Sequence, residues 1–392
     1  MSKPPPLLLL RNLLSQPPSL RVWHRLLRVL QRAEESEQQM LVEYASQHLE
    51  TWPDRLRVLD FVDESLAIWP LVRHLEFWRS LSSEDIFPFV TLPSFHLPGV
   101  SNEQNRLIYK SFHWKETARV TGLDLSVVFY QGDSQMMYHT MTSLSKRLPS
   151  LQHLKLQVSG DVQSGRADFL ASLSGLKTLH LRSRCWYSRN SIFDELKALK
   201  LLTDLTIDGP HFIWMTPTQL ETLSFPTSLC SLRVMNIPGI PSLKLFRKLR
   251  RLESLSLGNL SALRWTGNNI TEIFPTDWEV LERLAYLQHL ELKECKNLSS
   301  LEVFGALTGL KSLRLSGLVA CHELRGLGRL EELEELELMG LPEVVLEELE
   351  PLSSLKHLRL QSRTPPKAGD WEGLLQERFP QLQTLDLRFP VL

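Results

Sequence analysis

Leu333-Glu-Glu-Leu336-Glu-Leu338 shows in its clearest form a hexamer that recurs through most of the chain. The pattern is L-x-x-L-x-L, and Ile or Val replaces the last leucine in two copies. Because a repeat of this length cannot bury its apolar side chains alone, it predicts a solenoid whose units stack on one another. Ten copies follow at steps of 22 to 35 residues and open at Leu151, Leu176, Leu202, Leu229, Leu252, Leu287, Leu310, Leu333, Leu355 and Leu382.

Each hexamer predicts a short strand, since its fourth and sixth residues are apolar and the residue between them is polar. A Gly or Asn often follows, as at Gly317 and Gly340, and apolar residues then recur at every third position. A spacing of three predicts 3₁₀ turns and irregular coil rather than a regular α-helix. We therefore expect a parallel sheet on the concave side, and irregular, 3₁₀ or helical segments on the convex side.

The pattern resembles that of the leucine-rich repeat family over at least residues 148–392. Regular members carry Asn or Cys three residues after the hexamer, and here only Leu287 to Leu298, with Cys295, retains that signature. Uneven repeat lengths and the missing Asn column are similar to irregular intracellular members of the family. The resemblance implies an α/β leucine-rich repeat solenoid that binds proteins and has no chemistry of its own.

The first part of the chain differs from the rest. Ser19 is placed to cap a helix with Trp23 on its apolar face, and Ser36 to Gln39 matches a capping box that would open a second helix ending at Leu49. We expect these helices to shield the first repeat as an N-terminal cap. The alternative is a separate docking region for another protein.

Between these helices and the first clear hexamer, the repeat is present but eroded. Leu56 to Phe61, Val72 to Phe77, Leu92 to Leu97 and Val120 to Leu125 fit the template with substitutions. We therefore predict three regions: an α-helical N-terminal cap or docking region at 1–55, degenerate leucine-rich repeats at 56–150, and the ten clear repeats at 151–392.

Composition and motifs exclude several functions. The 392 residues carry a formal net charge of −1, and no motif of hydrolases, metalloproteases or nucleotide-binding proteins occurs. Histidines lack metal-ligand spacing, and no apolar run reaches the roughly 18 residues of a membrane span. Four cysteines in different repeats predict free thiols in a reducing compartment. We expect no enzymatic activity, no cofactor, no metal, no membrane insertion and a cytoplasmic location.

Charged side chains occupy the fifth hexamer position, which should face the concave side together with the third and seventh positions. From Glu291 onward this column alternates strictly in sign. Strands about 4.8 Å apart would let these charges pair across the sheet. Two interpretations remain open, a solvated face whose charges neutralise one another and a charge-patterned protein interface. The alternating column is Glu291, Arg314, Glu337, Arg359 and Asp386.

The earlier part of the same face carries cations that look less well opposed by acids, although Asp204 and Asp208 lie between them. Beside them, a loop adds arginines and aromatic residues, the types that dominate protein interfaces. We predict a partner-binding patch here, while packing of the two aromatic rings under the loop as a small core is an equal alternative. The candidate residues are Lys155, His180, Arg182, Arg184, Trp186, Tyr187, Arg189 and Arg233.

The function that these observations favour is a non-enzymatic scaffold or recognition protein that binds a protein partner through its repeat surface. An alternative is a substrate-recruiting adaptor subunit of a larger complex, with the N-terminal helices docked to the machinery. Binding of nucleic acid or another anionic ligand through Arg182–Arg189 and Arg247–Arg251 ranks below both, because the chain has no overall positive charge.

Overall fold

A computed structural model describes most of the chain, and it divides into two compact units, residues 1–181 and 182–392. The described residues are 4–60, 66–82, 119–129, 148–160, 170–183, 196–209, 225–235, 242–258, 262–266, 269–273, 277–343, 348–364 and 371–388.

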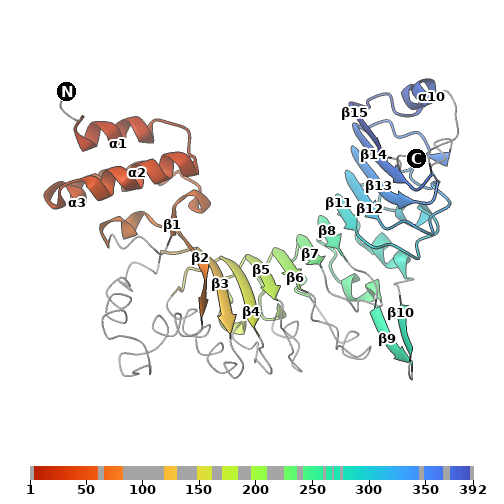
Figure 1. Ribbon diagram of the computed structural model, residues 1–392, viewed down its shortest axis with the longest axis horizontal. Helices are drawn as coiled ribbons and strands as arrows, with labels where there is room; N and C mark the ends of the chain where they lie inside the picture. The colour runs from red at the N-terminus through yellow and green to blue at the C-terminus, as the bar shows by residue number, and fades with distance from the viewer. Residues whose placement is uncertain are drawn as a thin grey trace. The chain divides into compact units, whose positions relative to one another are not determined.

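Three helices open the first unit: α1 (Pro6–Leu14), α2 (Leu20–Arg32) and α3 (Glu35–His48) (Figure 1). Ser19 caps α2 as predicted, since its hydroxyl accepts a hydrogen bond of 3.3 Å from the Val22 amide. The predicted apolar face of α2 is buried, and its indole ring at Trp23 is fully enclosed. The helix thus contributes a full apolar stripe to the core of this unit.

Two features of the helical region differ from the expectation. The capping box at Ser36 is wrong, because α3 already begins at Glu35 and its N-cap residue, Glu34, makes no side-chain capping bond. The Glu34 carbonyl accepts from the amides of Glu37 and Gln38, so Ser36 lies inside the first turn. Helix α1 was not anticipated; Pro6 occupies its first position, where a missing N–H costs nothing.

The strands of the first unit follow these helices and pair in parallel. They are β1 (Val58–Asp60), β2 (His74–Ser82), β3 (Gly122–Phe129), β4 (His153–Gly160) and β5 (Thr178–Ser183), ordered as in the sequence. The short 3₁₀ segment η1 (Asp54–Leu56) precedes β1, η2 (Leu66–Leu71) lies between β1 and β2, and η3 (Leu170–Ser172) lies between β4 and β5. Three of the four eroded hexamers thus carry a strand, and the one at Leu92 lies outside the described residues.

The second unit continues the pattern with eight further strands in one parallel order. They are β6 (Asp204–Asp208), β7 (Ser231–Met235), β8 (Ser254–Leu257), β11 (His289–Leu292), β12 (Ser312–Ser316), β13 (Glu335–Leu341), β14 (His357–Ser362) and β15 (Thr384–Arg388). All ten clear hexamers therefore contain a strand, which confirms the predicted parallel-sheet solenoid.

The return segments confirm the interpretation of the three-residue spacing. In one of them, the amides of Phe304, Leu307 and Leu310 each donate to the carbonyl three residues earlier, at 2.9–3.0 Å. Such bonds define 3₁₀-type turns. The named segments are η4 (Leu243–Phe246), η5 (Trp278–Arg283) and η6 (Glu302–Phe304), and the described part of the last return contains a helix, α10 (Trp371–Arg378).

The longest repeat carries an insertion with regular structure. Strands β9 (Ala262–Thr266) and β10 (Asn269–Ile273) pair antiparallel and form their own two-stranded sheet, apart from the parallel one (Figure 1). The 35-residue step between Leu252 and Leu287 is thus explained by a hairpin added to the return segment. Another of the longer repeats contains the aromatic stretch Phe212 to Met215, which lies outside the described residues.

The hexamer leucines form the core of the second unit. Leu333, Leu336 and Leu338 are at most 1% exposed, and the same three positions are buried in the repeats before and after. The last strand is different, because Leu385 of β15 is 41% exposed at the end of the strand order. A repeat therefore buries its leucines only where it is covered on both sides.

A residue in the left-handed conformation recurs in three consecutive repeats. Glu294, Gly317 and Gly340 have φ values of 63°, 74° and 84°, and each lies seven residues after the start of its hexamer. Glu294 and Gly317 follow the ends of β11 and β12, and the buried Cys295 donates its amide to the carbonyl of Ser316 at 2.9 Å. The glycine predicted to break the strand does so at Gly317, whereas Gly340 lies inside β13, at a shift in register between Met339 and Leu341.

Candidate partner-binding surface

The polar face of the second unit is defined here as the side chains at the third, fifth and seventh hexamer positions of β6–β8 and β11–β15. They are exposed or half-buried in most strands, in contrast to the buried leucines beside them. The register places Glu291 opposite Arg314, and Arg314 opposite Glu337. It then places Glu337 opposite Arg359, and Arg359 opposite Asp386. The predicted column of alternating charge therefore exists as a row across neighbouring strands.

The C-terminal end of this row forms the predicted ion-pair ladder. Arg359 contacts Glu337 at 3.5 Å and Asp386 at 2.8 Å, so one guanidinium joins the strands on both sides. Arg388 adds a second bond to Asp386 at 2.9 Å. Hydrogen bonds from Arg388 and then Arg359 hold the pKa of Asp386 below its ordinary value. The Asp386 carboxylate therefore stays ionised at neutral pH.

Arg314 departs from the ladder. Its guanidinium pairs at 2.9 Å with Glu335, a third-position residue, and no ion pair with Glu291 or Glu337 forms among the described side chains. Glu335 also accepts from the hydroxyl of Ser312 at 3.1 Å. The hydrogen bond from Arg314 is the main cause of the lowered pKa of Glu335. The ion pairs of the charged row thus involve both the third and the fifth hexamer positions, rather than the fifth position alone.

Glu291 is the centre of a second cluster. Its carboxylate accepts from the Ser256 hydroxyl at 2.5 Å, from Arg233 at 3.1 Å and from Lys293 at 3.0 Å. Burial alone would raise the pKa of Glu291, but the bonds from Ser256 and Lys293 and the nearby positive charges outweigh it and lower the pKa. The small side chain at Ser256 lets Arg233, two strands away, reach this carboxylate.

A shallow depression lies on the polar face above β12–β15. Its volume is about 210 Å³, and charged or hydrogen-bonding side chains form most of its lining. In its wall, the Nδ1 atom of His357 and the hydroxyl of Thr384 are hydrogen-bonded at 2.7 Å. A site of this size accommodates one or two side chains, and it is smaller than the roughly 300–1,000 Å³ of typical small-molecule sites. The polar lining residues are Arg314, Glu335, Glu337, His357, Arg359, Thr384 and Asp386.

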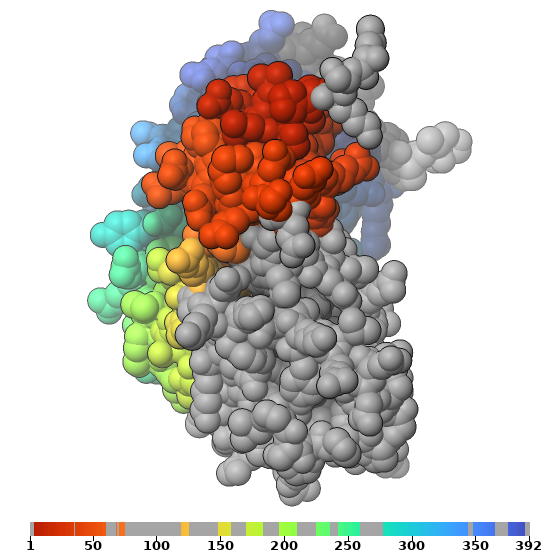
Figure 2. All heavy atoms as spheres, turned by 90° about the vertical axis from the view of Figure 1, so that its left-hand side faces the viewer, coloured from red at the N-terminus to blue at the C-terminus, as the bar shows by residue number. Residues whose placement is uncertain are grey.

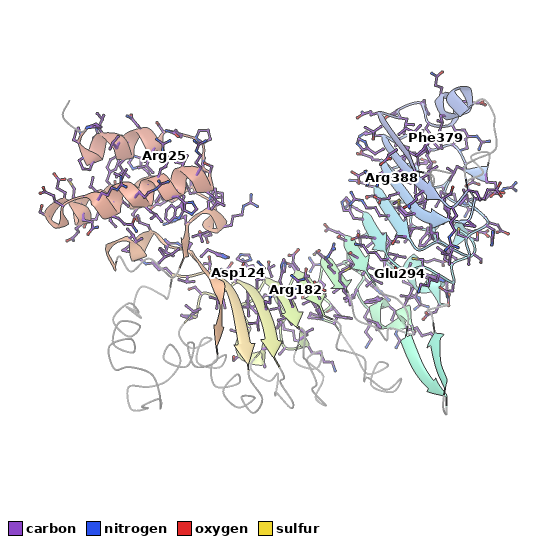
Figure 3. The ribbon with its side chains drawn as sticks, in the orientation of Figure 1. Arg25, Asp124, Arg182, Glu294, Phe379 and Arg388 are labelled. Atoms are coloured by element: carbon purple, nitrogen blue, oxygen red, sulfur yellow. The ribbon has the colours of Figure 1, made fainter. Side chains whose placement is uncertain are left out.

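The prediction that the earlier cations are less well opposed by acids is wrong for three of them. In the first unit, Lys155 pairs with Asp124 at 2.7 Å, an in-register neighbour supplied by an eroded repeat. In the second unit, Arg182 lies 3.5 Å from Asp208, and Arg233 pairs with Glu291. Asp124 and Arg182 are labelled in Figure 3. Counting the column only from Leu151 had left Asp124 out.

Of the remaining candidate residues, His180 alone lies within the described part of the chain. His180 lies on β5 with an exposed side chain. Arg184, Trp186, Tyr187 and Arg189 lie outside the described residues, so their proposed role stays a prediction. The sequence reasoning placed the third, fifth and seventh hexamer positions on this face, but it did not single out Glu335, Ser256 or His357 as hydrogen-bonding or ion-pairing members of it. The third hexamer position was the available signal for Glu335 and His357.

Neither a metal-binding cluster nor a membrane-spanning helix occurs in the described part of the chain. There, no group of three or more His, Cys, Asp or Glu side chains could hold a metal ion. Within the same part, none of the helices combines the length and apolar character needed to cross a membrane.

No protein-family model and no curated protein sequence matches the chain. Among solved structures, it is similar to the leucine-rich repeat protein LIC12759 of Leptospira interrogans, with 16% identity, a TM-score of 0.42, and coverage of 88% of this chain and 91% of that one. It is also similar to the leucine-rich repeat-containing protein LegL7 of Legionella pneumophila, with 16% identity, a TM-score of 0.37, and coverage of 72% and 90%. The recurring hexamer strands, their parallel order and their buried leucines show that the chain folds as a leucine-rich repeat solenoid.

Proposed function

We propose that this protein is a non-enzymatic scaffold that binds another protein through the polar face of its second unit. The observation that carries the proposal is the charged row from Glu291 to Asp386. Parallel strands hold its side chains in register, and these side chains are 24–52% exposed where they form ion pairs. A row of this kind offers a fixed pattern of donors and acceptors to a partner.

The chemistry of the row favours a protein over a polyanion. Glu335, Glu337 and Asp386 lie among the arginines, so a chain of phosphates would be repelled at every second position. A protein surface can instead present both signs and match the pattern. The paired charges add little affinity by themselves, but they reject partners whose charges are out of place.

The experiment uses the full chain immobilised as bait in lysate of its source cells, with captured proteins identified and quantified. A polar-face variant, Arg314→Gln with Glu337→Gln and Arg359→Gln, removes two cations and one anion. A matched control, Arg325→Gln with Arg329→Gln and Glu332→Gln, removes the same charges from exposed positions of a return segment. We expect a protein captured in reproducible ratio by the wild type and the control, and lost from the polar-face variant.

Two outcomes would contradict the proposal. One is that the wild-type bait captures no protein in a reproducible ratio. The other is that the polar-face variant captures the same proteins as the control in the same amounts, while its circular dichroism and thermal unfolding match the wild type.

A further inference from the structure

Helix α2 carries a stripe of four arginines on its outer side. Arg21, Arg25, Arg28 and Arg32 follow at steps of four, three and four residues, which places them within roughly 60° of the helix circumference. The opposite side of the helix is fully apolar and buried. No acidic residue occurs anywhere in α2. Arg25 is labelled in Figure 3. We refer to these four residues as the arginine stripe.

The arginine stripe has no counterion among the residues that the structure describes. All four side chains are exposed, and none forms an ion pair with any residue that the structure describes. One donor is used internally, since Arg28 bonds the His24 carbonyl at 3.2 Å. On the sheet of the second unit, by contrast, Arg233, Arg314 and Arg359 are each paired with a carboxylate. The guanidinium groups of α2 are therefore available to another molecule.

Helix stability does not explain the stripe. Arg21 lies in the first turn, where the helix dipole disfavours a positive charge, and no acidic residue in that turn compensates it. A mixture of positive and negative charges would keep the protein equally soluble, so solubility does not require a row of arginines alone. An uninterrupted positive row about 16 Å long, at 1.5 Å per residue, is instead suited to receiving a row of negative groups.

The helix presents this row rigidly. Trp23, on the buried side, donates a hydrogen bond of 2.6 Å from its indole Nε1 to the Val58 carbonyl of β1. Leu26 and Leu30 are 0% exposed. The three helices form one continuous mass in the space-filling view (Figure 2). Because its apolar side is already used in the core, α2 cannot turn that side into a lipid bilayer, as an interfacial helix would.

The surroundings favour carboxylates on a protein over phosphates on a nucleic acid. Exposed Glu37 and Glu43 lie on α3, so the helical region carries both signs on separate helices. A surface that carries both signs is matched more readily by a protein than by a continuous polyanion. Trp23, the single Trp, Phe or Tyr of α2, is buried, so the His24 imidazole is the one exposed ring of this helix on which a base could stack.

We propose that the arginine stripe binds an acidic helix of a partner protein, whose carboxylates recur at the same three- and four-residue spacing. Guanidinium groups bind carboxylates in a bidentate manner, which sets the register between the two helices. This surface is separate from the polar face, so the inference does not depend on the proposed function above.

The test is a fluorescence anisotropy titration of the full chain against a labelled alanine-based helical peptide. The peptide carries glutamates at positions 3, 7, 10 and 14, the spacing of the stripe. The test variant changes all four arginines to glutamine, which has a similar helix propensity. The matched control changes Arg247, Lys248, Arg250 and Arg251 to glutamine, because these four cations are also exposed and form no ion pair with a described residue. Net charge is then identical in the two variants.

We expect the wild type and the control to bind the peptide equally, and the stripe variant to bind about tenfold or more weakly, since four exposed ion pairs are lost. A peptide with its glutamates distributed around the helix should also bind more weakly. The single variant Arg25→Gln, with a smaller loss, covers the case in which the fourfold variant fails to fold.

Three results would overturn the inference. The wild type fails to bind the peptide, the stripe variant binds as well as the control, or the wild type prefers duplex DNA, poly(U) or phosphatidylserine vesicles over the peptide. The last result would reassign the stripe to phosphate groups.

Discussion

The indole of Trp23 and the carbonyl of Val58 form a 2.6 Å hydrogen bond that joins α2 to the first strand of the repeat sheet. Both groups are buried, so replacing Trp23 with phenylalanine would leave the carbonyl without its donor. We expect Trp23→Phe to lower the free energy of unfolding of the first unit by about 1–3 kcal/mol, in addition to the loss of ring area. Urea denaturation followed by circular dichroism measures this change.

Trp52→Phe is the matched control for this prediction. Trp52 is also buried, at 5% exposed, and its indole donates no hydrogen bond to the described residues. Both variants lose part of an indole ring, but only Trp23→Phe loses a bond between the helices and the sheet. Equal destabilisation by the two variants would show that the bond contributes nothing beyond packing.

Gly317 is expected to tolerate no side chain. Its φ of 74° is strained for any other residue, and a Cβ atom there would lie 2.8 Å from the Cα of Glu294 in the preceding repeat. We expect Gly317→Ala to cost about 1–3 kcal/mol. Gly309→Ala is the control, because a Cβ at Gly309 meets no atom within 4 Å. Thermal unfolding of the two variants gives the comparison, and a loss of stability at Gly309 as large as at Gly317 would refute it.

Much of the fold is predictable from the sequence because one physical requirement repeats. Leucines at the first, fourth and sixth hexamer positions must be covered by neighbouring repeats, which fixes the parallel strands and their register. The three-residue apolar spacing from Leu301 to Leu310 likewise predicts the observed 3₁₀ turns. The predicted start of α3 was wrong because the sequence matches a capping box at Ser36, whereas the helix already begins at Glu35.

The candidate surface is less predictable, since it depends on which of two similar partners a long side chain selects. Arg314 lies in register with Glu337, yet it pairs with Glu335, two residues away on the same face. Diagonal neighbours across a sheet are within reach of an arginine, so spacing alone does not distinguish them. Arg233 reaches Glu291 only because the residue between them, Ser256, is short. Such pairings depend on three strands at once.

Glu291 gives a prediction for the pH dependence of stability. Its pKa is lowered in the folded protein despite partial burial, because Ser256 and Lys293 bond the carboxylate. A carboxyl whose folded pKa is depressed stabilises the fold above its unfolded pKa, about 4.5, and the gain is lost as pH falls through the folded value. The wild type should therefore exceed Glu291→Gln in stability at pH 7, and the difference should shrink below about pH 4.

Denaturation of wild type and variant at pH 7, 5, 4 and 3 measures that difference. Glu302→Gln is the control, because Glu302 is exposed and its carboxylate forms no ion pair with a described residue. The control should show the same stability as the wild type at every pH. A difference for Glu291→Gln that stays constant from pH 7 to pH 3 would mean that the carboxylate charge is not the stabilising feature.

The buried thiols of the second unit provide a test of its core. Cys295 and Cys321 are 0% exposed, whereas Cys230 is partly exposed. Burial raises the pKa of Cys295, and it raises the pKa of Cys321 to about 11, so about 0.1% of the Cys321 thiol would be ionised at pH 8.

With Cys185 replaced by serine, we expect a thiol reagent to modify Cys230 alone in the folded protein. The other two should react only after unfolding, because both the ionised fraction and access are low. Mass spectrometry of the labelled peptides distinguishes the three sites. Rapid labelling of Cys295 in the native state would show that the return segments open more readily than their leucine packing implies.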